Sequence, residues 1–354
     1  MSFLSLERVE KTYADGTCAV RGIDLEVDEG EFIVLLGPSG CGKTTTLRMI
    51  AGLEPTSAGI IRLAGREVTK LPPSQRDVGM VFQFYALYPH LRVRDNIAFP
   101  LRCAGLSRQE IRARLDTVVE QMNLASLLDR FPKQLSGGDQ QKVSLARAIV
   151  RKPAAYLMDE PLGTLDADQR VSLRELIRAR QLELKVTTIY VTHDQEEAMS
   201  LADRIVVMSQ GLIRQVGTPA QVYDEPQDEF VASFVGSPGM NFFAGDVLSE
   251  GNKCIFVAPA GGARLELSRA SRPGPVTLGI RSEYVHVDGG GSIAGGVITD
   301  EYVGSFRNLH VDSELGRLVL RAEPSAKYQR GDQVRLRLEP EHIVVFETTP
   351  QGTP

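Results

Sequence analysis

The sequence predicts two domains: an α/β domain built around a glycine-rich loop, and a smaller all-β domain that follows it. Three features lead to this prediction. The motif GPSGCGKTT at 37–45 separates an apolar run from a helical pattern, and a second apolar run at 155–160 ends in two carboxylates. Beyond residue 240, short strand-like runs alternate with Gly, Asp and Pro turns. The length of 354 residues agrees, since single cores seldom grow past about 250 residues.

Composition and charge narrow the possible functions. The formal net charge is −5 at pH 7 and the sequence has no basic cluster, which argues against a nucleic-acid-binding surface. There is no run of about 18 apolar residues and no signal-peptide pattern, so we expect a cytoplasmic chain that does not cross a membrane. The 4 cysteines are far apart with no C-x-x-C pair, which is typical of reduced thiols without a structural metal.

The glycine-rich motif has the pattern of a phosphate-binding loop. It fits G-x-x-x-x-G-K-[ST], follows the apolar run 32–36 and opens a helical pattern at 45–51. Its glycines allow a tight turn whose N–H groups face inward, and the helix adds its positive end. We expect Lys43 to reach the β and γ phosphates of a nucleotide, and the Thr44 hydroxyl to bind Mg2+. These features predict an α/β P-loop NTPase whose phosphate site is formed by Gly37, Pro38, Ser39, Gly40, Cys41, Gly42, Lys43, Thr44 and Thr45.

An antiparallel hairpin is predicted before this loop. Residues 3–12 and 17–27 alternate apolar and polar side chains around a short turn. Tyr13 at the tip could stack on adenine, although an exposed tyrosine is more often plain surface. Further strands are expected at 59–65 and 76–83.

A helical insert is predicted at about 84–150. Its helical segments lie near 94–103 and 107–122, and Ser107 with Glu110 forms a capping box at the start of the second one. The insert separates the first strands from the strand that carries the carboxylates.

A second helix start with the geometry of an anion site closes the insert. Ser136 is placed to cap a helix, and Gly137 and Gly138 follow it directly. A serine and two glycines at a helix start can bind phosphate, so the chain carries two phosphate-facing helix starts. Without the first loop, a plain capped helix would be an equally good interpretation.

The strand at 155–160 ends in Asp159 and Glu160. Strand periodicity sends their side chains in different directions, so the two can do different jobs. Asp159 can hold Mg2+, and Glu160 can accept a proton from the water that attacks the γ-phosphate. The strand 187–192 ends at His193, which could orient Glu160 and this water, although an isolated His at such a place is more often structural.

The domain boundary is predicted at a Gly-Ser-Pro-Gly linker. Residues 1–235 form the first domain, and residues 236–354 form a second one that we interpret as a β-barrel. Five glycines at 289–296 predict a flexible connection inside the second domain.

In this order, the motifs resemble those of the ATP-binding subunits of ABC transporters, over nearly the whole chain. GPSGCGKTT resembles Walker A, LSGGDQQ at 135–141 the family signature, and YLMDEP at 156–161 Walker B. Gln83 resembles the Q-loop glutamine, GTLD at 163–166 the D-loop, and His193 the switch histidine.

The resemblance implies an ATPase in which two copies pair head to tail. Each ATP with its Mg2+ then lies between the phosphate loop of one copy and the signature helix of the other. The implied catalytic residues are Gln83, Glu160 and His193, the metal-binding residues are Thr44, Gln83 and Asp159, and the remaining nucleotide-binding residues are Tyr13, Ser136, Gly137, Gly138 and Asp139.

Two positions depart from the family pattern. Asp139 stands where the signature usually has glutamine, and Gly163 stands where the D-loop usually begins with serine. An added carboxylate near phosphate should weaken closure of the pair by about 1 kcal/mol unless it is screened or hydrogen-bonded.

Other segments resemble the maltose-type importer ATPases of bacteria. These are VTHDQEEAM, QVGTPAQVYDEP and FVGSPGMNFF, and in the tail LGIRSEY and RGDQVRLRLEPEHIVVFE, which resemble an oligonucleotide/oligosaccharide-binding-like (OB-like, TOBE) regulatory domain. The resemblance implies uptake of sugars, oligosaccharides or glycerol phosphates. It also implies a place on the cytoplasmic face of the inner membrane, with two transmembrane permease subunits docked on the aromatic loop 85–90 and the insert. An extracytoplasmic solute-binding protein is an indirect partner, and nucleic acid is not one.

Three alternatives stay open. Close relatives energise polyamine, sulfate or ferric-ion uptake. The rival from another class is a soluble ABC-type ATPase of DNA repair or translation, but those chains usually carry long coiled-coil inserts or two nucleotide domains. A third interpretation makes the β tail a binding module for a regulator or a sugar.

Overall fold

The computed structural model describes residues 2–251, 253–259, 262–268 and 271–347. The chain divides into two compact units between Pro219 and Ala220. Within the described residues, every helix is too short or too polar to cross a membrane.

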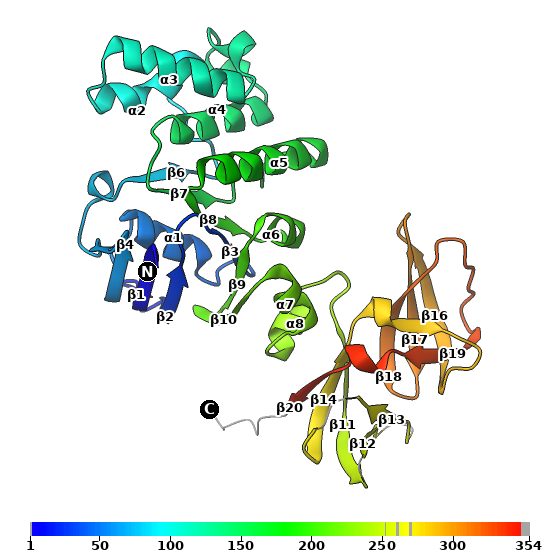
Figure 1. Ribbon diagram of the computed structural model, residues 1–354. Coiled ribbons are helices and arrows are strands. Elements are labelled where there is room, and N and C mark those ends of the chain that lie inside the picture. The colour runs from blue at the N-terminus through cyan, green and yellow to red at the C-terminus, as the bar shows by residue number, and fades with distance from the viewer. Residues whose placement is uncertain (1, 252, 260–261, 269–270, 348–354) are drawn as a thin grey trace. The chain divides into compact units, whose positions relative to one another are not determined.

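A six-stranded sheet forms the centre of the first unit (Figure 1). In spatial order its strands are β10 (Leu212–Gly217), β9 (Arg204–Ser209), β3 (Phe32–Leu36), β8 (Thr187–Thr192), β7 (Ala155–Asp159) and β6 (Val78–Val81). The pairs from β9 to β6 are parallel, and β10 is antiparallel to β9. Every residue of β3, β7 and β8 is buried, as expected for parallel strands covered on both faces.

A four-stranded antiparallel sheet packs against this centre through helix α1 (Lys43–Ala51). Its strands are β2 (Cys18–Val27), β1 (Leu4–Thr12), β4 (Ala58–Leu63) and β5 (Arg66–Glu67). The predicted hairpin is confirmed, because β1 and β2 pair antiparallel.

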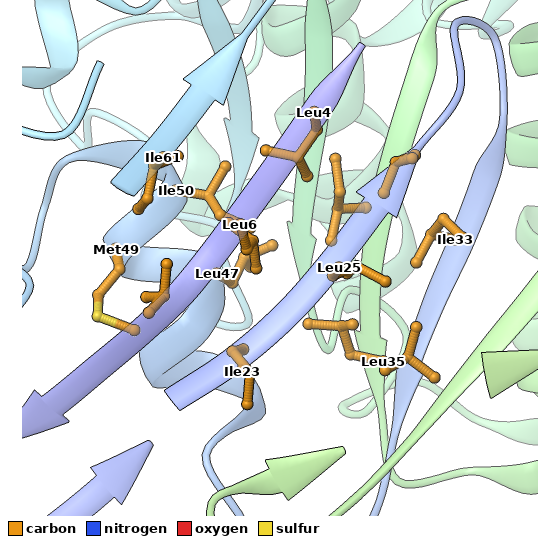
Figure 2. Close-up of a cluster of buried hydrophobic side chains, with 14 of the residues drawn as sticks. Leu4, Leu6, Ile23, Leu25, Ile33, Leu35, Leu47, Met49, Ile50 and Ile61 are labelled. Atoms are coloured by element: carbon orange, nitrogen blue, oxygen red, sulfur yellow. The ribbon is translucent and has the colours of Figure 1, made fainter. Parts of the chain in front are cut away.

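One apolar cluster joins the two sheets to α1. Figure 2 shows its labelled side chains pointing toward one another, and they are Leu4, Leu6, Ile23, Leu25, Ile33, Leu35, Leu47, Met49, Ile50 and Ile61. Full burial of each such side chain stabilises the fold by about 1.5–3 kcal/mol. Since β3 and α1 are both held in this cluster, the glycine-rich loop between them is fixed at both ends.

The helical insert follows β6. It contains α2 (Val93–Cys103), α3 (Arg108–Gln121) and α4 (Gly137–Ile149), which form a layer far from β1 and β2 in Figure 1. The predicted caps are confirmed: Ser107 and Glu110 form a capping box, and the Ser136 hydroxyl accepts a hydrogen bond from the N–H of Asp139. Helices α5 (Ala167–Leu184) and α6 (Gln195–Leu201) complete the first unit.

The second unit is mainly antiparallel β-structure, which confirms the all-β prediction. Among its described residues, this unit begins with α7 (Pro219–Asp224, of which only Pro219 belongs to the first unit) and α8 (Glu229–Phe234), followed by two five-stranded sheets. One sheet contains β13 (Arg264–Leu267), β12 (Lys253–Val257), β11 (Asn241–Glu250), β14 (Gly274–Ile280) and β20 (Val344–Glu347). The other contains β15 (Val285–Val287), β19 (Gln333–Leu338), β16 (Ile293–Tyr302), β17 (Arg307–Ser313) and β18 (Gly316–Ala322). Side chains from both sheets form one buried core.

The prediction of a flexible connection at 289–296 is wrong for its second half. Strand β16 already begins at Ile293, and Gly295 and Gly296 pair with both β17 and β19. A Cβ on Gly295 would lie 2.5 Å from Val311 Cγ1. Glycine is therefore required there by close packing rather than by flexibility.

Candidate active site

The residues predicted to carry chemistry lie at the carboxyl ends of neighbouring strands. The glycine-rich loop follows β3, His193 follows β8, Asp159 and Glu160 lie at the end of β7, and Gln83 comes soon after β6. The strands β3, β8, β7 and β6 are adjacent and parallel, so their carboxyl ends meet at one edge of the sheet. The fold thus gathers residues from four separate parts of the sequence.

The loop after β3 has a backbone that needs glycine. Gly40 and Gly42 have φ angles of 78° and 108°, in the region that L side chains rarely adopt. A Cβ on Gly37 would lie 2.3 Å from the carbonyl oxygen of Met208, and one on Gly42 would lie 2.5 Å from that of Ala19. Gly37 and Gly42 therefore have no room for a side chain, whereas Gly40 is required by its backbone conformation alone, and the loop forms a compact cradle.

Lys43 lies inside this cradle. Its ammonium group donates to the carbonyl oxygens of Gly37 at 2.7 Å and Pro38 at 3.0 Å, and the side chain is 5% exposed. Cys41 is also buried, and its sulfur lies 3.8 Å from the Lys43 nitrogen. A buried ammonium group whose hydrogen bonds go to neutral acceptors favours an anion beside it, because burial of a charge is costly without a partner of opposite sign.

Tyr13 lies beside the end of the loop. Its hydroxyl is 3.4 Å from Thr45 Oγ1, and the Lys11 ammonium lies 4.9 Å from the centre of its ring. Tyr13 is 38% exposed, so part of its side chain is accessible to a further stacking partner.

Thr44 and Asp159 form a pair of oxygen ligands. The Thr44 hydroxyl donates to Asp159 Oδ1 at 2.8 Å. Burial raises the pKa of the Asp159 carboxyl above its ordinary value of 3.8, and the hydrogen bond from Thr44 acts in the opposite direction. A hydroxyl and a buried carboxylate are hard oxygen ligands that suit Mg2+, and a cation would favour the charged form that burial disfavours.

Glu160 is held between Gln83 and His193. Its Oε2 accepts a hydrogen bond from Gln83 Nε2 at 3.0 Å, and its Oε1 lies 3.2 Å from His193 Nδ1. The residue has φ of 44°, which is uncommon for a residue other than glycine and occurs often at functional sites. The side chains of Asp159 and Glu160 therefore diverge, one toward Thr44 and the other toward Gln83 and His193. Gln83 lies against Glu160 and not against the oxygen pair.

A buried carboxylate supports the segment that carries His193. The hydroxyls of Tyr190 and Thr192 both donate to Glu197 Oε2 at 2.8 Å, and the N–H of Asp194 donates to Thr192 Oγ1 at 3.0 Å. Burial raises the pKa of the Glu197 carboxyl. The sequence analysis did not identify Glu197. Its place on the inner face of α6, beside apolar positions, was the available signal.

The signature residues face a different cleft. It has a volume of about 290 Å³ and lies between the first turns of α4 and α5. Its lining residues are Ser136, Gly138, Asp139, Lys142, Asp168, Gln169, Ser172 and Leu173. Among the residues that the structure describes, none of the loop 37–45 contributes to this lining, and α1 and α4 lie well apart in Figure 1. Within one copy, the two phosphate-facing helix starts do not form a common site.

Helix α4 also holds the segment after Gln83, which the sequence analysis missed. Tyr85 and Ala86 have φ of 55° and 49°. Their carbonyl oxygens accept hydrogen bonds from Arg147, at 3.0 and 2.7 Å, and the Ser144 hydroxyl also donates to Tyr85 at 2.9 Å. The Tyr85 hydroxyl lies 2.8 Å from Thr164 Oγ1. The helical spacing of Ser144 and Arg147 from Ser136 was the signal that could have revealed this contact.

Fold and site together define a P-loop nucleotide hydrolase that is followed by a mainly β domain. The ABC transporter family profile matches residues 20–163, the MalK OB fold domain matches 236–285 and the TOBE domain matches 278–346. The chain is 44% identical over 351 residues to the sn-glycerol-3-phosphate import ATP-binding protein UgpC of Paracoccus denitrificans, a match that covers 98% of each chain. It is 49% identical to the trehalose import ATP-binding protein SugC of Mycobacterium tuberculosis, over 80% of this chain and 73% of that one. The chain belongs to the ABC transporter family of ATP-binding proteins and is an ABC-type ATPase.

Solved structures agree with this assignment. A cbiO1 structure from Clostridium perfringens, part of the ABC transporter complex cbiONQ, gives a TM-score of 0.59 at 28% identity, covering 63% of this chain and 91% of that one. The dimeric ATP-binding cassette MJ0796 bound to ADP and Pi gives a TM-score of 0.57 at 30% identity, covering 61% and 98%. The predicted ABC-type fold and ATP as the nucleotide are confirmed.

Proposed function

We propose that this chain is the energy-coupling ATPase subunit of a bacterial importer for sugars, oligosaccharides or glycerol-phosphate-type solutes. The names of UgpC and SugC support this solute class. So does that of the diacetylchitobiose uptake protein MsiK of Streptomyces coelicolor, 41% identical over 99% of this chain and 98% of that one. A polyamine, sulfate or ferric-ion importer is the weaker alternative, because these relatives are named for sugars and glycerol phosphate.

The observation that carries the hydrolytic role is the carboxylate of Glu160, held between Gln83 and His193 beside the pair of Thr44 and Asp159. Glu160 accepts the proton of the attacking water, while Gln83 and His193 fix the direction of its two oxygens. Mg2+ held by Thr44 and Asp159 would neutralise charge on the phosphates. Gln83 donates to Glu160 here, so it would have to turn toward this pair to act as the third ligand.

The other nucleotide contacts follow from the loop and the hairpin. Lys43 and the backbone N–H groups of residues 37–45 bind the β and γ phosphates. Tyr13 stacks on the adenine ring with its exposed face.

A complete site requires two copies. The cleft lined by Ser136, Gly138 and Asp139 lies apart from the phosphate loop of its own chain. Gly137 lies between these residues, as the first residue of helix α4. We place these residues against the γ-phosphate of ATP bound by the facing copy, in a head-to-tail pair. The dimeric form of the similar cassette MJ0796 supports this arrangement.

The remaining parts of the chain are assigned to coupling. Residues 1–235 form the nucleotide-binding domain and residues 236–354 the OB-like regulatory domain, a boundary supported by the start of the OB match at residue 236. Two permease subunits dock on the loop 85–90 and the insert, next to the Phe84 side chain, which is 74% exposed. The protein then lies at the cytoplasmic face of the inner membrane, with a solute-binding protein on the outer side.

The rival function is that of a soluble ABC-type ATPase in repair or translation. The OB and TOBE matches, together with the import protein UgpC matching over 98% of this chain, favour the importer. Co-fractionation of the chain with a permease pair in membranes would support the importer, and its absence would favour the rival.

Glu160→Gln tests the hydrolytic role. Gln keeps the shape of the side chain but cannot take up the proton, so the ATPase rate should fall by about 100-fold or more. The variant should still bind ATP and then accumulate as a dimer on size-exclusion chromatography. Glu196→Gln is the matched control, because Glu196 is an exposed carboxylate near His193 with no place in the site. A normal ATPase rate for Glu160→Gln would exclude Glu160 as the base.

A further inference from the structure

The hydroxyl group of Ser136 is occupied within its own helix turn. It donates to Asp139 Oδ2 at 2.8 Å and accepts from the Asp139 N–H at 3.2 Å. A hydroxyl has a single proton to donate, so Ser136 has none left for another acceptor in this state. Because the acceptor is a carboxylate, the bond is of the stronger, charge-assisted kind.

The charge around this hydroxyl also disfavours an incoming phosphate. The cleft is lined by two carboxylates, Asp139 and Asp168, and by one ammonium group, Lys142. Lys142 lies one helical turn after Asp139, and compensates part of this charge. Asp139 differs from Asp168 in one respect that matters here, which is its direct bond to Ser136.

We propose that Asp139 is a positioning residue that sets the ATP concentration at which two copies close. This inference rests on the proposed head-to-tail pairing. On closure, the Ser136 hydroxyl must turn its proton from Asp139 toward the γ-phosphate of the facing copy. The carboxylate then loses its donor and lies near a second negative charge. Both effects stabilise the open state relative to the closed one.

Asp139 is expected to affect the closing of the two copies and not the hydrolysis of ATP itself. Thr44, Asp159, Glu160 and His193 are contributed by the copy that binds ATP through its own phosphate loop, and their contacts do not involve Asp139. Substitution of Asp139 should therefore change the ATP concentration for half-maximal activity much more than the maximal rate.

The test measures ATP-driven dimerisation by sedimentation velocity in full-length Glu160→Gln protein, over a range of ATP concentrations. Adding Asp139→Asn keeps an acceptor for the Ser136 proton and removes the charge, so half-maximal dimerisation should need about 5-fold less ATP. Asp139→Ala also removes the acceptor and should lower this concentration further. In both variants the backbone N–H of residue 139 can still donate to the Ser136 hydroxyl, which caps the helix. Thermal melting checks that the stability of the protein is unchanged.

Asp168→Asn is the matched control, because it removes a carboxylate from the same cleft without touching Ser136. It should shift the ATP dependence by less than Asp139→Asn does. In the chain with Glu160 intact, Asp139→Asn should lower the KM for ATP by a larger factor than it changes kcat.

The outcomes separate the inference from the function on which it rests. If Glu160→Gln protein does not dimerise at any ATP concentration, the proposed pairing fails and this inference fails with it. If that protein dimerises and Asp139→Asn leaves its ATP dependence unchanged, or Asp168→Asn shifts it equally, pairing stands and the role of Asp139 is overturned.

Discussion

The buried carboxylate of Glu197 makes the stability of the fold depend on pH. Burial raises its pKa above the ordinary value of 4.5, so the folded protein keeps this proton to a higher pH than the unfolded chain does. Between those two pKa values the folded state binds more protons. The free energy of unfolding therefore decreases as the pH rises through that window.

We predict that Glu197→Gln makes the free energy of unfolding fall less steeply as the pH rises. The amide oxygen still accepts from the Tyr190 and Thr192 hydroxyls, but it has no charge to desolvate. Urea unfolding at several pH values from about 4.5 upward measures the slope. Glu196→Gln changes the same charge at an exposed position and should leave the slope as it is. Equal slopes for Glu197→Gln and the unchanged chain would contradict the prediction.

At this scale, the sequence revealed residues with local signals and missed those whose partners are distant. Asp159 and Glu160 were predictable because alternation along one strand separates their side chains. Glu197 was not, because the Tyr190 and Thr192 hydroxyls that satisfy it come from β8, and only the packing of α6 on β8 brings them close.

Helix α4 links the signature residues to the segment that follows Gln83. Arg147 donates to the carbonyl oxygens of Tyr85 and Ala86, which lie in the left-handed region of backbone conformation. Such conformations persist when the surrounding contacts fix them. The same helix begins at Gly137, directly after its cap Ser136. One rigid element therefore carries the signature residues in its first turn and contacts the segment after Gln83 near its other end.

We predict that Arg147→Ala makes the segment 84–90 less firmly held against α4. Loss of two hydrogen bonds and of packing over the Tyr88 ring should lower the stability by about 2 kcal/mol. Arg147→Lys should recover only part of it, because an ammonium group cannot form the same fork. Limited proteolysis between residues 84 and 90, with thermal melting, measures both effects.

Arg112→Ala is the control for this experiment. Arg112 is 85% exposed in α3 and forms an i,i+4 ion pair with Asp116, which should contribute little to stability. Cleavage rates that rise equally in both variants would show that Arg147 does not hold the segment.

At the level of elements, predictions that depend on neighbouring residues succeeded. The caps at Ser107 and Ser136 start α3 and α4 as expected, because each cap is formed within one turn of chain. The segment 289–296 was misjudged for the opposite reason. Glycine composition gives no information about how closely β17 approaches β16, and that approach is what requires Gly295.

Over the whole molecule, the order of strands decides which residues meet. The sequence placed the phosphate loop, Asp159, Glu160 and His193 at strand ends, but their proximity follows from β3, β8 and β7 lying side by side. The sequence also indicated two phosphate-facing helix starts. The structure adds that no residue of the loop 37–45 lines the cleft beside the signature helix, which is why the proposed pairing gives each copy half of two sites.

This division predicts complementation between two inactive variants of the full chain. Lys43→Ala removes the phosphate-loop cation, and Ser136→Ala removes the donor of the signature helix, so each variant alone should lose at least about 10-fold in ATPase rate. In an equal mixture, half of the dimers are mixed. Each mixed dimer has one site with both residues intact and one site with neither. If sites act independently, the mixture should recover about a quarter of the unsubstituted rate.

Dilution supplies the control for that mixture. The unsubstituted protein should lose specific activity as it is diluted, because pairs dissociate, and the recovered activity of the mixture should fall over the same concentration range. Activity that survives dilution, or a mixture no more active than its components, would mean that each site is complete within one copy. In that case the separate cleft between α4 and α5 would not face the ATP of a second copy. The Ser136 hydroxyl would then donate its hydrogen bond to Asp139 throughout the ATPase cycle.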